Sequence, residues 1–295
     1  MKRTFSLIGM AAMVLLLSVS CKKEEKNGMK TVRFDAGIEQ DGGKHYINNL
    51  YEQYWTLGDM IKVNGIDLEA IFVDNPDLHQ GFSVFEGTMP EDQEFKAPYY
   101  AVYPSTSRMY TYEGTGETGW ETGQHCIDVE FKDVQTYVSG TFDPTAAPMA
   151  AVAQENKINF QTMYSLLQFS LYSGEGKALS ISKLVLNSKP LGSNPAIIAG
   201  KAAYNQDSGE NKPDESTLKT SITLNCTNPV EIPASIDGKV PFYFVIAPCK
   251  MGGFTLEVYT SDDESAPYVT INSDNSVTVV QNAGNLVYYN VPVKK

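Results

Sequence analysis

The chain has 295 residues, of which 42% are hydrophobic, and a formal net charge of -12. So acidic a molecule repels nucleic-acid phosphates and anionic lipid heads, which excludes a binder that relies on a basic patch. Its 4 cysteines are too few for a disulfide scaffold, and the length predicts two domains rather than one.

Residues 1–20 read as a bacterial export signal, with Lys2 and Arg3 before an apolar run over residues 5–17. That run is too short for a membrane-spanning helix, which needs about 20 apolar residues. Cys21 follows directly, at the position where a lipoprotein receives its diacylglyceryl group. The pattern therefore predicts a lipid anchor at Cys21, with a secretory signal and a chance cysteine as the alternative.

Residues 21–30 are predicted to form a lipidated tether. The stretch "KKEEKNG" within them has no apolar side chain to bury, so it favours a solvated segment.

Short alternation of apolar and polar residues begins at residue 31 and continues to the C-terminus. Such a period of two, interrupted by Gly, Pro, Asn and Asp at intervals of roughly ten residues, is typical of antiparallel β-sandwiches. In "TVRFDAGI" at 31–38, one face of the predicted strand carries Val32, Phe34, Ala36 and Ile38. The fold class is therefore predicted to be all-β.

The alternation weakens between residues 140 and 157, where prolines and alanines gather. We therefore expect two domains, an N-terminal β-sandwich over 31–155 and a C-terminal β-sandwich over 156–295. Residues 147–153, "APMAAVA", are the best candidate for a short helix. Residues 200–220 are polar and rich in turn formers, which predicts a long exposed loop.

The last segment, "NLVYYNVPVKK", shows the same alternation of side chains as the first predicted strand. One of its faces carries Val287, Tyr289, Val291 and Val293, while Asn290 and Pro292 interrupt the other. Proline cannot donate a ladder hydrogen bond, so pairing on both edges must fail there. The segment is either the last strand of its own domain or a strand that is donated to another molecule.

No pattern in the sequence indicates catalysis, a metal site or a cofactor. The histidines lie in three separate turn-rich segments, and no phosphate loop, nucleophile elbow or zinc-protease helix appears. The chain is therefore predicted not to be an enzyme. Trp120, in the glycine-rich stretch "TGETGWETG", is the best candidate for an exposed ring that contacts a ligand.

Three cysteines follow the predicted anchor, namely Cys126, Cys226 and Cys249. An odd number cannot be fully paired within the chain. Buried free thiols are expected, with a single bridge between Cys226 and Cys249 as the alternative.

Several segments resemble the fimbrillins of Bacteroidales in their order along the chain. They are the lipoprotein signal, "VRFDAGI", "YWTLGDMIKVNG" at 54–65, "YYAVYPSTS" at 99–107, "QTMYSLLQFSLY" at 161–172 and "VPFYFVIAP" at 240–248. The tether's Lys23, Glu24 and Glu25 also resemble the signal that sends such lipoproteins to the outer face of the outer membrane. The resemblance implies two tandem transthyretin-like β-sandwiches of mainly antiparallel strands.

The resemblance also implies a function. Fimbrillins build surface fimbriae by donor-strand exchange, in which a protease removes the first strand and a neighbour's strand fills the vacated groove. The side chains that would leave the groove with the first strand are those of Val32, Phe34, Ala36 and Ile38. The candidate donor strand carries Val287, Tyr289, Val291 and Val293. The family's usual arginine is missing from residues 39–54, so Lys44 is the candidate maturation site.

The sequence thus predicts an outer-membrane, lipid-anchored surface protein of the fimbrium that acts in cell adhesion. Its predicted partners are other fimbrillin-like subunits, the outer membrane, and a host protein or glycan, with no nucleic acid. The alternative is a surface glycan-binding lipoprotein for nutrient capture.

Overall fold

Strands account for nearly all the regular structure of the computed structural model, which describes residues 28–38, 55–73, 82–114, 119–279 and 287–294. The helical elements are single 3-10 turns at Pro144–Ala146, Glu215–Thr217 and Ile236–Gly238. The predicted all-β class is confirmed. No helix in these ranges has the length and apolar character needed to cross a bilayer.

Seven strands close into a barrel in the order β1-β10-β9-β5-β2-β3-β4. They are β1 (Met29–Ile38), β2 (Met60–Val63), β3 (Ile66–Val73), β4 (Phe82–Pro90), β5 (Tyr99–Tyr103), β9 (Met149–Ala153) and β10 (Lys157–Thr162). A sandwich of two sheets was expected here. The barrel forms instead because β1 pairs antiparallel to β4 and parallel to β10, which joins the two ends of the sheet.

Two sheets of the second half face each other across one hydrophobic core. One contains β16 (Val240–Ile246), β11 (Ser165–Ser173) and β21 (Val287–Val293). The other contains β19 (Val269–Ser273), β18 (Gly253–Thr260), β12 (Leu179–Lys189), β15 (Ser221–Ile232) and β8 (Val134–Thr136). A small ladder of β17 (Cys249–Met251) and β20 (Val277–Val279) lies beside them.

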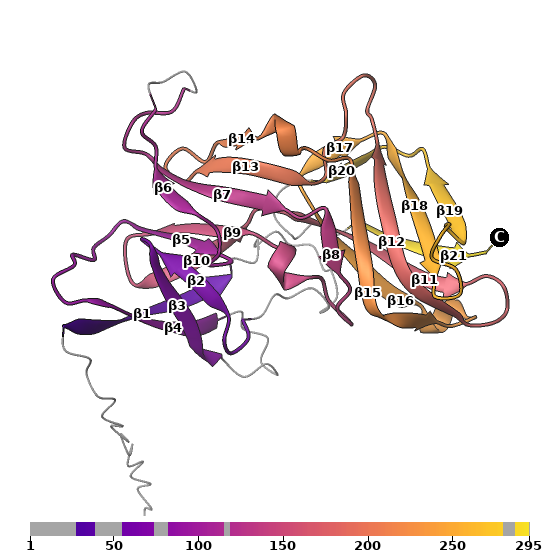
Figure 1. Cartoon of the computed structure of the whole chain (residues 1–295), viewed down its shortest axis with the longest axis horizontal. Helices are drawn as coiled ribbons and strands as arrows, with labels where there is room; N and C mark the ends of the chain where they lie inside the picture. Colours follow the sequence, from indigo (N-terminus) through magenta and orange to yellow (C-terminus); the bar gives the residue numbers. More distant parts are fainter. Residues whose placement is uncertain (1–27, 39–54, 74–81, 115–118, 280–286, 295) are drawn as a thin grey trace, which may run out of the picture.

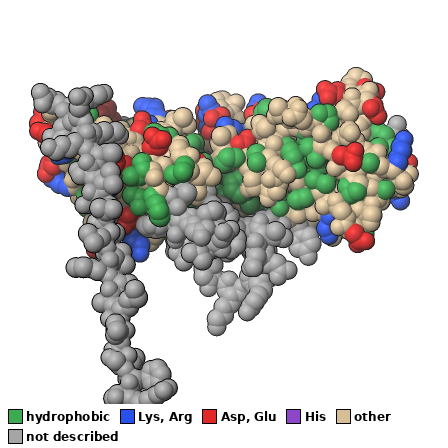
Figure 2. All heavy atoms as spheres, turned by 90° about the horizontal axis from the view of Figure 1, so that it is seen from below, with side chains coloured by type: hydrophobic (Ala, Val, Ile, Leu, Met, Phe, Trp, Pro, Cys, Tyr) green, Lys and Arg blue, Asp and Glu red, His purple; other side chains and the backbone are tan. Residues whose placement is uncertain are grey.

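A four-stranded sheet connects the halves. It comprises β14 (Asn211–Pro213), β13 (Gly200–Asn205), β7 (His125–Phe131) and β6 (Met109–Thr111). The loop expected over residues 200–220 is therefore wrong, since two of these strands lie there. Figure 1 shows the barrel and the C-terminal sheets side by side along the long axis, with β7 and β13 above the barrel and extending toward the C-terminal sheets. On the face seen from below, acidic and basic side chains are interspersed with hydrophobic ones (Figure 2).

Strands from the two predicted domains pair with each other. β7 pairs with β13, β8 pairs with β15, and β10 closes the barrel although it begins after the expected boundary near residue 155. The chain thus contributes β8 to the C-terminal sheet before it returns to the barrel with β9 and β10, so no single boundary near residue 155 separates the two bodies.

The candidate helix at 147–153 is also wrong, because β9 is a strand. It lies between β5 and β10, and Met149, Ala151 and Ala153 pack in the barrel core. Small side chains suit the crowded interior of a narrow barrel, so tertiary packing overrides the helix preference of alanine.

Candidate functional site

Strand β1 is a wall of the barrel rather than an appendage to it. Phe34 and Ala36 are buried, at 2% and 0% exposed, while Val32 and Ile38 on either side of them are half-buried. The Phe34 ring meets Tyr99 and Phe95 edge-on, with centroid distances of 4.9 and 5.8 Å. The face of the strand that the alternation predicted to be apolar is therefore the face that packs on the barrel core.

β1 is held more firmly on one side than on the other. Its pairing with β4 runs from Met29 to Gly37, whereas its pairing with β10 covers only Asp35 to Ile38. Among the described strands, the first half of β1 thus has a ladder on one edge alone. Departure of β1 would leave β4 and β10 as two free edges that a strand of the same direction could join.

Arg33 lies opposite Glu86 on the outside of this ladder. Its guanidinium Nη2 is 2.6 Å from the Glu86 Oε2, with the arginine side chain 66% exposed. An exposed pair of this kind contributes roughly 0–1 kcal/mol. Because Arg33 is part of the strand ladder, a protease that needs extended, unpaired backbone cannot cleave there while β1 is in place.

The C-terminal strand β21 occupies a place in its own half of the molecule. It pairs parallel to β11, and Val291 and Val293 are buried in the C-terminal core. The Tyr289 ring stacks on Phe169 at 5.4 Å. Among the described strands, β21 is nevertheless an edge strand of its sheet, as β16 is at the other side. The side chain of Val287 lies outside the described residues, as do Cys21 and Lys44.

Trp120 is not the exposed platform that the glycine-rich setting predicted. The ring is 3% exposed, its Nε1 donates to Glu210 at 2.9 Å, and the Lys212 ammonium lies 4.3 Å from its centroid. Glu210 lies just before β14 and Lys212 lies within it, so a hairpin distant in sequence covers the indole. The expectation of an exposed ring is wrong.

The three body cysteines are free thiols: Cys126 is buried and the other two are half-buried. Burial raises the pKa of Cys226 to about 12 and that of Cys249 to about 11. Both therefore stay protonated at neutral pH and are poor nucleophiles.

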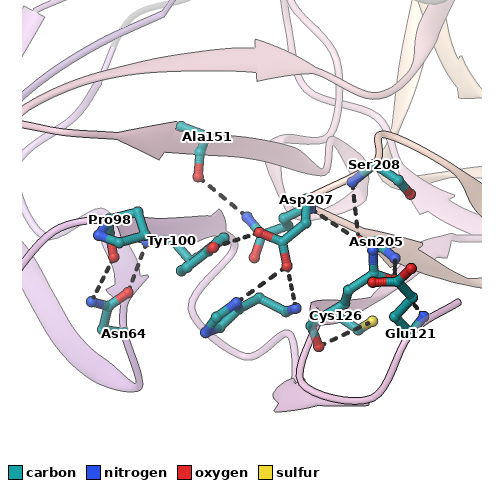
Figure 3. Close-up of polar contacts among 12 residues, drawn as sticks. Asn64, Pro98, Tyr100, Glu121, Cys126, Ala151, Asn205, Asp207 and Ser208 are labelled. Carbon is teal, nitrogen blue, oxygen red and sulfur yellow. Dashed lines mark hydrogen bonds and ion pairs between the residues drawn. The ribbon is translucent and has the colours of Figure 1, made fainter. Parts of the chain in front are cut away.

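A polar cluster joins the barrel to the four-stranded sheet, and Figure 3 shows Tyr100 and Asp207 pointing toward each other within it. The Tyr100 hydroxyl donates to Asp207 Oδ1, and the His125 backbone N–H donates to Oδ2 at 2.6 Å. His125 Nδ1 lies 3.2 Å from the same oxygen, and its ring stacks on Tyr100 at 3.7 Å. The sequence shows no local pattern that predicts this cluster, because its three members lie in separate segments of the chain.

The cluster shifts the ionisation of its members in opposite directions. Burial, the hydrogen bond to Asp207 and the charge of that carboxylate raise the pKa of Tyr100 to about 12. Burial opposes ionisation of Asp207, but hydrogen bonds from Tyr100 and His125 outweigh it and lower the pKa of the carboxyl.

Replacing Tyr100 by phenylalanine is expected to lower the free energy of unfolding by about 1.5–3 kcal/mol at pH 8, because a hydrogen bond to a carboxylate is lost. The tyrosine pKa is raised on folding from 10.0 to about 12, so its contribution is present below pH 10 and lost as the pH rises through about 12. Urea unfolding of both proteins at pH 8 and near pH 12 measures this. A difference that does not shrink at high pH would contradict it.

The cluster and its surroundings show no metal centre. Within the described part of the chain, no three His, Cys, Asp or Glu side chains are placed to hold one ion.

Solved structures that resemble the chain include several proteins from Bacteroides. A "putative cell adhesion protein" from Bacteroides uniformis has 13% identity and a TM-score of 0.47, with 90% of this chain and 93% of that chain covered. A protein of the same description from Bacteroides ovatus has 17% identity and a TM-score of 0.47, with 90% and 92% covered. A fimbrial protein from Bacteroides vulgatus has 11% identity and a TM-score of 0.36, with 68% and 78% covered.

No protein-family model and no curated protein matches the chain. At these TM-scores and identities the likeness to solved structures supports no functional assignment by itself. These structural neighbours are described as cell adhesion and fimbrial proteins of Bacteroides.

Proposed function

We propose that this chain is a non-enzymatic, fimbrillin-like outer-membrane lipoprotein, anchored through Cys21 at the cell surface. It serves as a subunit or accessory component of fimbriae in cell adhesion and assembles by donor-strand exchange. Its two bodies correspond to the two transthyretin-like domains of that family.

One observation carries the proposal: the strand next to the predicted anchor completes the barrel. Val32, Phe34, Ala36 and Ile38 together contribute on the order of 5–10 kcal/mol of burial free energy as an upper bound. A barrel that loses β1 exposes an apolar groove with two unpaired edges, and only another apolar strand restores both.

The C-terminal strand repeats the side-chain pattern of β1. Aligned in the same direction, Val287, Tyr289, Val291 and Val293 match Val32, Phe34, Ala36 and Ile38, with an aromatic ring second in each. Figure 1 places β1 and β21 at opposite ends of the long axis. A contact between unlike ends is heterologous and can extend without closing, as a filament requires.

The match is imperfect at two positions. Val291 would bring two extra methyl groups to the site of the fully buried Ala36, at a cost of roughly 1–3 kcal/mol. Pro292 would take the place of Gly37, which pairs with both β4 and β10. A strand from a different subunit would fit better, which favours an accessory position over a repeating shaft of this chain.

The proposal is tested by cutting the chain after Lys44 through an inserted protease site and adding a peptide of residues 29–38 or 286–295. We expect the cut protein to exchange its first strand for the peptide, with 29–38 taken up more readily than 286–295. Because of the mismatches at Val291 and Pro292, oligomers of this chain alone should form only at high concentration, as measured by light scattering. A peptide 29–38 with Asp in place of Phe34 is the control and should not exchange. A cut protein that stays monomeric and takes up neither peptide would overturn the proposal.

A further inference from the structure

A cleft of about 480 Å³ opens beside the Tyr100–His125–Asp207 cluster. Its walls come from the loop before β5, the turn between β2 and β3, and the edge strand β6. Four aromatic side chains line it, namely Phe95, Tyr100, Tyr110 and His125. The volume lies within the range of small-molecule sites, which is about 300–1,000 Å³.

The side chains at the base of the cleft are fixed by contacts with one another. Asp207 holds His125 through Nδ1, which directs the opposite ring nitrogen, Nε2, away from the carboxylate. The Asn64 amide donates to the carbonyls of Lys96 and Pro98 and accepts from the Tyr100 backbone N–H. A ligand would therefore meet a preformed surface, which reduces the entropy lost on binding.

Strand β6 adds backbone groups to this surface. Among the described strands it pairs only with β7, through bonds such as Asp128 N–H to Arg108 C=O and Tyr112 N–H to Gln124 C=O. The direction of the backbone hydrogen bonds alternates along an antiparallel strand. The N–H and C=O groups of Met109 and Thr111 therefore point away from β7, toward the free edge of β6. Both of these residues line the cleft.

The charges at the rim balance each other. The Lys96 ammonium lies 3.0 Å from the Glu94 carboxylate, and both side chains are more than two-thirds exposed, at 72% and 74%. Arg108, which lies over Tyr110, is likewise 3.9 Å from the Asp128 carboxylate. The described side chains around the cleft thus offer no excess positive charge to an anion, and the polar backbone groups disfavour a lipid chain. Aromatic faces together with paired donors and acceptors suit an uncharged ring that carries hydroxyl groups.

We propose that this cleft binds a neutral sugar, a hexose or N-acetylhexosamine at the end of a glycan. The Arg108 guanidinium lies 4.7 Å from the centroid of the Tyr110 ring. The sugar ring therefore packs against the opposite face of Tyr110, and its hydroxyl groups bond to His125 Nε2 and to the backbone of β6. This inference rests on the proposed adhesive function and names the class of molecule, a neutral glycan, to which the protein would adhere. Sugar binding by the isolated chain requires no assembly, so this inference and strand exchange can fail separately.

The test is saturation-transfer NMR and calorimetry on the full chain with a panel of neutral mono- and disaccharides. We expect at least one sugar to bind with a dissociation constant of about 0.1–10 mM. Thr111→Trp places a large ring at an exposed position in the cleft and should abolish binding while leaving the melting temperature unchanged. Tyr110→Ala should weaken binding at least about tenfold.

Tyr259→Ala is the matched control, because Tyr259 lies on β18 in the C-terminal sheets and should leave affinity unchanged. Absence of binding across the panel would overturn the inference, and so would binding that survives Thr111→Trp. Binding confined to anionic sugars or to peptides would also overturn it.

Discussion

Replacing Phe34 by alanine is expected to lower the free energy of unfolding by about 3–5 kcal/mol, which is the usual effect of removing a buried aromatic side chain. Phe34 is 2% exposed and packs on Phe95 and Tyr99 from within β1. The ring anchors the strand that closes the barrel, so its loss should also speed exchange of β1 for an added peptide. Urea unfolding and peptide-exchange rates measure the two effects.

Thr31→Ala is the control on the same strand, because Thr31 is exposed on the opposite face. Its expected effect is within about 0.5 kcal/mol. A Phe34→Ala protein as stable as the Thr31→Ala protein would show that β1 is dispensable for the barrel, against the burial seen here.

The second large effect is expected at Gln135, which is 1% exposed on the short strand β8. Its side-chain Nε2 donates to the Val245 carbonyl at 2.6 Å, and its Oε1 accepts from the Val245 N–H at 3.0 Å. The Gln135 side-chain amide thus makes the two hydrogen bonds to the free edge of β16 that the backbone of a neighbouring strand would make. It connects the sheet that contains β8 to the one that contains β16.

Gln135→Met keeps the volume but leaves both Val245 groups buried and unpaired. At about 1–3 kcal/mol for each orphaned group, we expect a loss of roughly 2–5 kcal/mol in the free energy of unfolding. Hydrogen exchange at the Val245 amide should accelerate as well. Val134→Ala, at a 56% exposed position on the same strand, is the control. Equal stability of the two variants would contradict a structural role for the amide pair.

Several features of the candidate site could be predicted from the chain and others could not. The inward faces of β1 and β21 follow from alternation, because a side chain's direction in a strand depends only on its position. Trp120 was misread because its flanking glycines indicate a turn, whereas its burial depends on Glu210, 90 positions away. The Tyr100–His125–Asp207 cluster likewise assembles from three separate strands and loops, which a single sequence does not relate.

The sequence by itself determined the all-β class and the apolar face of each strand, since both follow from local periodicity and residue type. Only the tertiary structure decided which strands are neighbours. In that structure, β1 pairs parallel to β10 and so closes the barrel. The alanine-rich segment forms strand β9, and the polar stretch forms strands β13 and β14. Strand pairing depends on hydrogen bonds and packing between distant segments, and alternation carries no information about the partner.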